Sequence, residues 1–260
     1  MAAVAKREMR IRPGVEVAGL SDVGCLRENN EDHYAYWEPA GQEQFRDKGR
    51  LALVADGMGG HEGGQEASHI AIDTVQDVYS RSQAGDPRSV LIEGFQTAHR
   101  RILDYAEKHP QLQGMGTTCT AVVIRGRDLY YAHVGDSRLY LIRDSKIYRL
   151  SRDHSYVGRL LEQGIINSEE AASHPQRNIL LMALGAGPEI APESPEQPIS
   201  LESRDLLLLC TDGLWSQVSD SEMLAATASG PLKQACRKLV EKAKQHGGPD
   251  NITVQALRIK

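Results

Sequence analysis

Leu51-Ala-Leu-Val-Ala-Asp-Gly57 and Leu206-Leu-Leu-Leu-Cys-Thr-Asp-Gly213 are the two stretches that decide the fold. Each is a short apolar run that leads into an Asp-Gly pair. A continuous apolar run of this length indicates a strand that is buried on both faces. An ionised aspartate at the end of such a strand is costly unless a cation or hydrogen-bond donors neutralise it. We therefore predict that Asp56 and Asp212, although far apart in sequence, share a metal site.

An Asp-Gly pair also has a simpler interpretation, which is a hairpin turn. Glycine supplies the positive φ angle that such turns need. After Asp56-Gly57, however, the chain runs Met58-Gly-Gly-His-Glu-Gly-Gly64 and then becomes helical, so no partner strand follows to close a hairpin. Further acidic groups border strand-like stretches in the same way, namely Glu31-Asp32, Asp136 and Asp250-Asn251.

The chemistry of these groups favours a hard divalent cation. The candidate ligands are carboxylates and the backbone carbonyl of Gly57, and no Cys or His stands at zinc spacing, so Mg²⁺ or Mn²⁺ is expected. Several aspartates that converge without a cation would repel one another and raise their own pKa values, whereas two divalent ions would keep all of them ionised. Two such ions roughly 3.5–4 Å apart form a site for phosphoryl transfer.

The whole chain suits a single domain that does not bind nucleic acid. At 260 residues it can bury one large core. A net charge of -5 leaves no basic surplus to neutralise a phosphate backbone. The apolar runs are far shorter than the roughly 18 residues of a membrane span. The four cysteines include no Cys-x-x-Cys pair, so we expect reduced, mostly buried thiols and a soluble cytoplasmic protein.

The order of the elements indicates an α+β fold. Residues 1–13 are expected to be a flexible lead-in, and 14–260 a single domain. Strands are expected at 15–20, 51–55, 205–211 and from 252, helices from 65, 86 and 231, an irregular helical segment at 154–184 and a loop at 185–198. Four further strands, at 117–125, 129–134, 138–142 and 146–150, are joined by short turns and predict an antiparallel meander. Strands and helices that come in separate blocks argue for helices that cover antiparallel sheets.

A series of short blocks, in order along the chain, resembles the bacterial form of the metal-dependent protein phosphatases of the protein phosphatase 2C family. The blocks are Asp22-x-Gly-x-x-Arg27-x-x-Asn30-Glu-Asp32, Asp56-Gly-Met-Gly-Gly-His61, Gly116-Thr-Thr118, Gly135-Asp-Ser-Arg138, Asp153-His154-Ser155, Arg177-Asn178, Thr211-Asp-Gly213 and Asp250-Asn251. One block alone would be weak, but the ordered set is highly specific.

The resemblance implies a four-layer α-β-β-α sandwich of two antiparallel sheets flanked by helices, with a flap-like segment at 150–187. It implies hydrolysis of phosphoserine and phosphothreonine on proteins by a water that is activated at a dinuclear Mn²⁺ or Mg²⁺ centre, with a third ion in bacterial members. The partners it implies are phosphoproteins, including Ser/Thr kinases, and we expect a monomer.

The resemblance also implies a role for each matching residue. Asp56 would bridge both metals, and Asp212 and Asp250 would complete the ligands of the first. The Gly57 carbonyl would bind the second metal, and Glu31 and Asp32 would bind it directly or through water. Asp136 with Asp212 would form the third metal site, and Arg27 would hold the substrate phosphate. Animal members carry their leaving-group acid directly after the Asp-Gly, where this chain has Met58, so His61 becomes the candidate acid. A capping or packing role for His61 is the alternative.

Three alternatives compete with this function. Cys119 and Arg125 have the Cys-x5-Arg spacing of thiol-dependent phosphatases, but the residues between them are β-formers without a glycine to let backbone N–H groups hold a phosphate. A phosphatase-like module that binds without turnover would be expected to have lost one of Asp56, Asp212 and Asp250. A metal-dependent phosphoesterase acting on small molecules remains the third alternative, because the sequence does not reveal the shape of the segment that sets specificity.

Overall fold

The computed structural model describes residues 12–60, 62–83 and 85–260, and its strands form two antiparallel sheets. The first sheet has the order β1 (Val15–Asp22), β11 (Ile252–Ile259), β10 (Leu206–Cys210), β7 (Arg138–Arg143) and β8 (Lys146–Arg149). The second has the order β2 (Asp32–Trp37), β3 (Arg50–Met58), β5 (Cys119–Arg125), β6 (Asp128–Val134) and β9 (Ile199–Ser200), and β4 (Gly116–Thr117) pairs with the end of β3.

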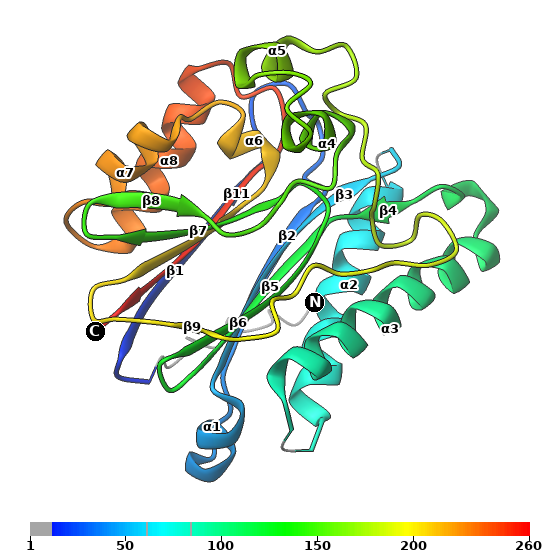
Figure 1. Ribbon diagram of the computed structural model, residues 1–260. Helices are drawn as coiled ribbons and strands as arrows, with labels where there is room; N and C mark the ends of the chain where they lie inside the picture. Colours follow the sequence, from blue (N-terminus) through cyan, green and yellow to red (C-terminus); the bar gives the residue numbers. More distant parts are fainter. Residues whose placement is uncertain (1–11, 61, 84) are drawn as a thin grey trace, which may run out of the picture.

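Helices cover the outer faces of both sheets (Figure 1). The helices in the described part of the chain are α1 (Gln42–Lys48), α2 (Glu62–Arg81), α3 (Pro87–Lys108), α4 (Tyr156–Glu162), α5 (Ser168–Ser173), α6 (Asp212–Trp215), α7 (Asp220–Thr227) and α8 (Leu232–Gln245), with a 3-10 turn at Pro110–Leu112. The helices α2 and α3 pack on the second sheet, and α8 packs on β1 and β11 of the first. The predicted four-layer sandwich is confirmed.

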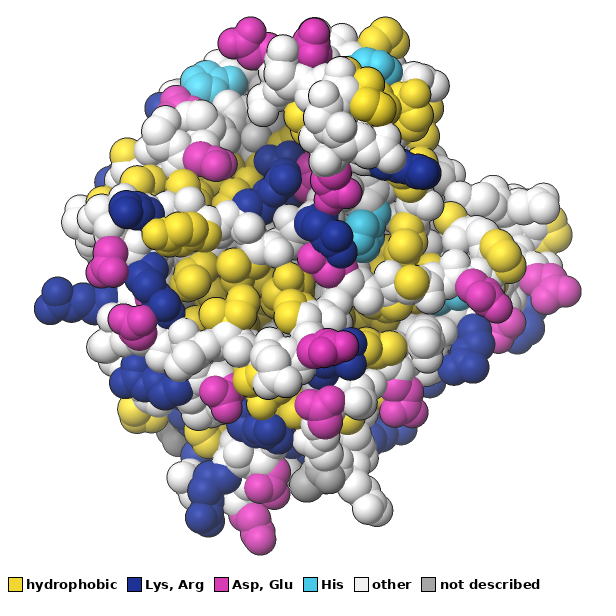
Figure 2. Space-filling model, viewed as in Figure 1, with side chains coloured by type: hydrophobic (Ala, Val, Ile, Leu, Met, Phe, Trp, Pro, Cys, Tyr) yellow, Lys and Arg dark blue, Asp and Glu magenta, His cyan; other side chains and the backbone are white. Residues whose placement is uncertain are grey.

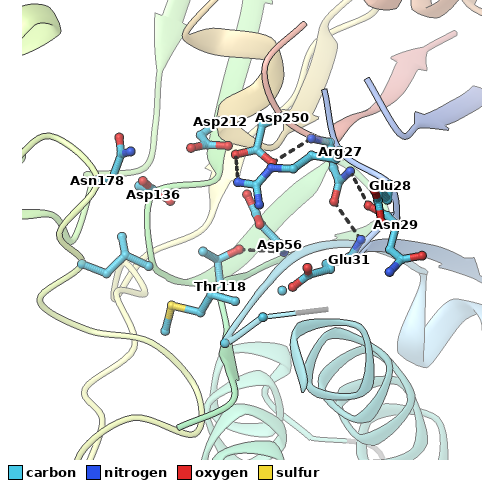
Figure 3. Close-up of a pocket in the computed structure, with 16 residues that line it drawn as sticks. Arg27, Glu28, Asn29, Glu31, Asp56, Thr118, Asp136, Asn178, Asp212 and Asp250 are labelled. Atoms are coloured by element: carbon cyan, nitrogen blue, oxygen red, sulfur yellow. Dashed lines mark hydrogen bonds and ion pairs between the residues drawn. The ribbon is translucent and has the colours of Figure 1, made fainter. Parts of the chain in front are cut away.

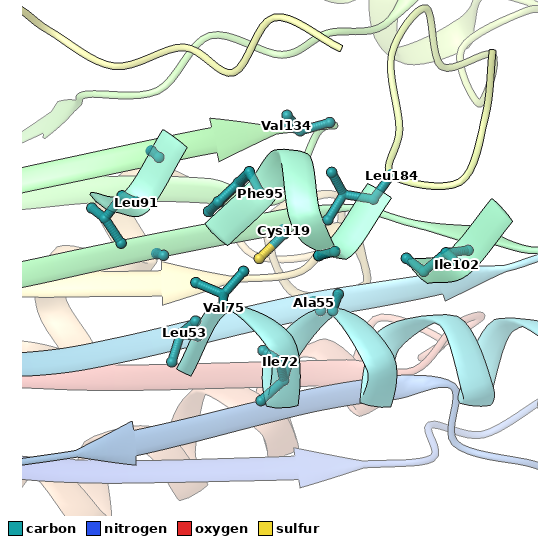
Figure 4. Packing of buried hydrophobic residues seen from close by; sticks show 14 of the residues in the cluster. Leu53, Ala55, Ile72, Val75, Leu91, Phe95, Ile102, Cys119, Val134 and Leu184 are labelled. Atoms are coloured by element: carbon teal, nitrogen blue, oxygen red, sulfur yellow. The ribbon is translucent and has the colours of Figure 1, made fainter. Parts of the chain in front are cut away.

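The alternation of side chains along β3 shows why its sequence is apolar throughout. Leu51, Leu53 and Ala55 point toward α2 and α3, where they join a core that includes Val75 and Phe95 (Figure 4). Ala52 and Val54 point the other way, into the core between the two sheets. A strand with both faces covered needs apolar residues at every position, because successive side chains face opposite sides. The prediction of a strand buried on both faces is confirmed.

The predicted four-strand meander is wrong at its centre. β5 pairs with β6 and β7 pairs with β8, but β6 and β7 belong to different sheets. The link between them, Gly135 to Ser137, crosses from one sheet to the other. A hairpin turn would leave its central residues exposed, yet Asp136 is 8% exposed and Ser137 is fully buried. Gly135 makes the crossing possible because its φ angle is +108°.

Other boundaries differ from the prediction near the end of β3. The strand continues through Asp56 and Gly57 and does not stop before them, and α2 begins at Glu62 rather than at Gln65. Gly63 and Gly64 suggest a loop in the sequence, but here they form the first turn of α2. The strand β2 and the helix α1 were not predicted. Residues 1–11 of the predicted lead-in lie outside the described residues.

The surface carries charges of both signs. On the face shown in Figure 2, Lys and Arg side chains alternate with Asp and Glu side chains. Several charged side chains of the described residues form ion pairs, such as Arg152 with Glu193 at 3.2 Å and Arg149 with Asp153 at 3.2 Å. Among the helices in the described part of the chain, none is both long and apolar enough to cross a membrane.

Candidate metal centre

The acidic residues singled out in the sequence, except Asp32, line one pocket at an end of the sandwich. The pocket has a volume of about 390 Å³ and is formed by loops and strand ends from both sheets. The predicted site residues that line it are Arg27, Glu31, Asp56, Gly57, Asp136, Asp212 and Asp250. The close-up in Figure 3 shows Asp56, Asp136, Asp212 and Asp250 directed into a shared space, with Arg27 beside them.

The two Asp-Gly pairs have different local structures, and neither is a hairpin turn. Asp56 and Gly57 continue in β3, where Gly57 pairs with Thr117, whereas Asp212 is the first residue of α6. The φ angles of Gly57 and Gly213 lie outside the positive range. Both positions need glycine because of close packing, since a Cβ atom would lie 2.1 Å from the Gly64 carbonyl oxygen at Gly57 and 1.9 Å from that of Asn251 at Gly213.

The backbone of Asp56 is fixed by two threonines at the end of β4 and just after it. The Asp56 N–H donates to Thr118 Oγ1 at 2.9 Å, and the Asp56 carbonyl accepts from the Thr118 N–H at 2.9 Å and from Thr117 Oγ1 at 2.8 Å. Thr118 Oγ1 also shares a hydrogen bond of 2.8 Å with Ser137 Oγ, next to Asp136. These bonds join the end of β3 to the link between the sheets, so the positions of Asp56 and Asp136 depend on each other.

Asn251 holds the loop that carries Arg27 and Glu31. Its Oδ1 accepts from the Glu31 N–H at 2.8 Å, and its Nδ2 donates to the carbonyls of Val23 at 3.0 Å and Asn29 at 2.9 Å. Arg27 itself donates to Asp250 Oδ2 at 2.8 Å. The sequence pairs Asn251 with Asp250 in a motif but does not reveal this role, although an amide can accept and donate at once.

Asp32 is the one described acidic candidate that does not line the pocket. It lies opposite Asp56 in the register of β2 and β3, is 5% exposed, and its Oδ2 accepts from Thr211 Oγ1 at 2.8 Å. It therefore lies behind the pocket wall, next to the strand end that precedes Asp212. His61, the predicted acid, lies outside the described residues. Lining residues to which the sequence gives no role are Glu28, Asn29, Met58, Gly59, Gly60, Thr118, Asn178, Leu180 and Asn251.

The electrostatics in and behind the pocket disfavour several ionised carboxylates close together in the absence of a cation. Burial, followed by repulsion from neighbouring aspartates, raises the pKa values of Asp56 and Asp136 well above their ordinary range. Burial and the nearby Asp250 raise the pKa of Asp212 to about 6, and burial raises that of Asp32 to about 7. Within the described residues, the buried Oδ1 atoms of Asp32 and Asp212 lack a hydrogen-bond partner. Such a set of oxygen ligands fits divalent cations of the Mg²⁺ or Mn²⁺ type.

These pKa values predict how the stability of the metal-free protein depends on pH. The folded-state values for Asp32 and Asp212, about 7 and about 6, lie above the ordinary value of 3.8. Between about pH 4 and pH 7 the folded protein therefore binds more protons than the unfolded chain, so these groups lower the free energy of unfolding as the pH rises. In chelator, Asp212→Asn should melt above wild type at pH 8 and show a smaller decrease in Tm from pH 5 to pH 8. Calorimetry that gives parallel curves for the two proteins would contradict this.

The thiol-dependent alternative does not fit the structure. Cys119 is fully buried in β5 and packs in the core between the second sheet and α2 and α3, away from the pocket. Burial raises the pKa of its thiol above the ordinary value, whereas a nucleophilic cysteine needs a lowered pKa.

Comparison with known proteins agrees with this geometry. A sequence model of the family described as protein phosphatase 2C matches residues 28–247. The serine/threonine protein phosphatase PstP of Mycobacterium tuberculosis is 37% identical over 246 residues, which are 94% of this chain and 45% of that protein. This chain thus spans about half the length of that relative. The serine/threonine phosphatase stp of Listeria innocua is 36% identical over 239 residues, which are 90% of this chain and 92% of that protein.

Solved structures extend the likeness to three dimensions. The crystal structure of the catalytic domain of the phosphatase PstP in complex with two manganese ions superposes with a TM-score of 0.81. It is 34% identical in sequence, and the match covers 95% of this chain and 98% of that one.

Proposed function

This chain belongs to the protein phosphatase 2C family, and we propose that it hydrolyses phosphoserine and phosphothreonine on proteins. The observation that carries the proposal is the gathering of Asp56, Asp136, Asp212 and Asp250 around one pocket with an arginine at its edge. A pocket built from buried carboxylates repels an anionic phosphate unless cations bind first. The arrangement therefore suits a metal-dependent enzyme.

The chain's own residues would hold two Mn²⁺ or Mg²⁺ ions, and a third beside them. Their ligands would be Asp56 for both ions of the pair, Asp212 and Asp250 for the first, Glu31 and the Gly57 carbonyl for the second, and Asp136 with Asp212 for the third. When bound, such ions lower the pKa of a water and stabilise charge on the transferred phosphoryl group. Asp32 would act indirectly, through water, because its side chain lies behind the pocket wall.

Arg27 would orient the substrate phosphate at the mouth of the pocket. Its side chain is 51% exposed and its guanidinium already lies against Asp250 at 2.8 Å. Guanidinium can donate two parallel hydrogen bonds to phosphate oxygens, a geometry that a lysine ammonium cannot match. His61 would protonate the leaving hydroxyl oxygen of the serine or threonine.

Loss of the Arg27 guanidinium should weaken substrate binding more than metal binding. Hydrogen bonds to charged groups contribute about 1.5–3 kcal/mol, so Arg27→Ala should raise KM for a phosphothreonine peptide by about 10- to 100-fold. Arg27→Lys keeps the positive charge but not the two parallel N–H donors, so its KM should lie between those of wild type and Arg27→Ala. Steady-state kinetics give KM and calorimetry gives the Mn²⁺ affinity. A large fall in metal affinity with KM unchanged would contradict the phosphate role.

A paired assay tests the proposed function. Phosphothreonine peptide and an aryl phosphate are each incubated with the protein in Mn²⁺ and in chelator. The proposal predicts turnover of both substrates in Mn²⁺ and of neither in chelator. Turnover of the aryl phosphate alone would point to a small-molecule phosphoesterase, and turnover of neither would point to a binding module.

The proposed substrates are phosphoproteins, among them Ser/Thr kinases that are themselves phosphorylated, and the proposed state is a monomer. A cytoplasmic location is supported by the cysteines, since all four are free thiols and three of them are buried.

A further inference from the structure

Two of the pocket aspartates come from segments that lie far apart in the sequence. Asp136 lies in the link that crosses from β6 to β7, and Asp212 begins α6 after β10. Any cation that the two share depends on how firmly the crossing link is tied to α6. A contact that joins the link to α6 can therefore set the metal affinity without being a metal ligand itself.

The indole of Trp215 makes this tie. Its Nε1–H donates to the backbone carbonyl of Asp136 at 2.9 Å. Trp215 is the last residue of α6, the four-residue helix whose first residue is Asp212. One side chain thus connects the backbone of one aspartate to the helical turn that carries the other.

The indole itself contacts a mostly buried cation. The guanidinium carbon of Arg138 lies 3.5 Å from the centre of the Trp215 ring. Arg138 donates to both carboxylate oxygens of Asp153, at 3.0 and 2.6 Å, and to the Tyr140 hydroxyl at 3.2 Å. The Arg138 and Asp153 side chains are only 16% and 6% exposed. A partly desolvated cation is attracted to the face of the indole and so favours this orientation of the ring.

We propose that Trp215 is a positioning residue that fixes the Asp136 carboxylate relative to Asp212 and so sets the affinity for the third divalent cation. The inference rests on the proposed function, because it assumes the metal ligands named there. Trp215 acts on the backbone of Asp136, which serves the third ion only. The two ions held through Asp56 and Asp250 have ligands on other segments as well, so they should be weakened much less than the third.

Trp215→Phe tests the proposal, because it keeps a ring over Arg138 and removes the N–H donor. Bound Mn²⁺ is counted by electron paramagnetic resonance of the free ion during a titration. We expect wild type to bind two ions and a weaker third, and the variant to bind the third at least tenfold more weakly, as is common for residues that orient metal ligands. The matched control is Trp37→Phe, which changes the other tryptophan, packed edge-on against Tyr79 at 6.2 Å. It should bind like wild type.

Asp136→Asn should lose the third ion completely and serves as the reference for the largest possible effect. If Trp215 acts through Asp136, the double variant with Trp215→Phe should bind its remaining ions like Asp136→Asn alone. Should Trp215→Phe not fold, Arg138→Lys loosens the stacking, keeps the N–H donor and should weaken the third ion about threefold. An unchanged third ion in both variants, equal weakening of all ions, or a wild type that binds only two would overturn the inference. Absence of Mn²⁺-dependent turnover in wild type would instead count against the proposed function.

Discussion

Asp212→Asn should abolish Mn²⁺-dependent hydrolysis of a phosphothreonine peptide, with kcat/KM lowered by about a thousandfold or more. Asp212 is proposed as a ligand of both the first and the third ion. Its Oδ1 atom is buried and has no hydrogen-bond partner among the described residues. A catalytic metal contributes several kcal/mol to transition-state stabilisation, and each 1.36 kcal/mol is tenfold in rate. The same loss is expected for Asp56→Asn.

The measurement is a kcat/KM comparison at saturating Mn²⁺, with circular dichroism to check that each variant folds. Asp104→Asn is the matched control, because Asp104 is exposed on α3 and the substitution is chemically the same. Near wild-type turnover in either site variant would refute the shared-metal account, since an amide cannot supply the negative charge of a carboxylate.

His61→Ala should lower turnover of the phosphothreonine peptide by about 10²–10⁴-fold, the usual contribution of a general acid. An aryl phosphate should lose only a few fold, because an aryl oxide is a stable leaving group that needs little protonation. Both substrates need the same metal centre, so the ratio of their losses isolates proton donation from metal binding.

His61→Gln separates the acid role from the alternative capping or packing role. Glutamine can still form hydrogen bonds but cannot deliver a proton as a general acid. If His61 is the acid, His61→Gln behaves like His61→Ala on the peptide. Recovery of peptide turnover by glutamine, or equal losses on both substrates for alanine, would assign His61 a structural role.

Much of this site could be predicted because its metal-binding residues lie in short sequence motifs. Leu51 to Ala55 predicts a doubly covered strand, and the cost of ending such a strand in a carboxylate leads directly to a cation. The helix at Pro87–Lys108 was equally predictable, because Asp86 caps it by accepting from the backbone N–H groups of Arg88 and Ser89. These signals are local, and each depends only on residues that are neighbours in the sequence.

What could not be predicted depends on side-chain direction and on long-range pairing. The link at Gly135 resembles a hairpin turn in sequence, and only the pairing of β6 and β7 with strands of different sheets distinguishes a crossing. Asp32 is adjacent to Glu31, but successive residues at a strand start face opposite sides, so only one of the two lines the pocket. The contacts that Asn251 and Trp215 make with residues distant in sequence have no local signature.

The most direct test of the account is a crystal of this protein soaked in Mn²⁺ and measured near the manganese absorption edge. Two anomalous difference peaks are expected within bonding reach of Asp56, with Asp212 and Asp250 on one of them and the Gly57 carbonyl on the other. A soaked crystal without anomalous density in the pocket, or with Asp56 and Asp250 on separate, unconnected ions, would contradict it.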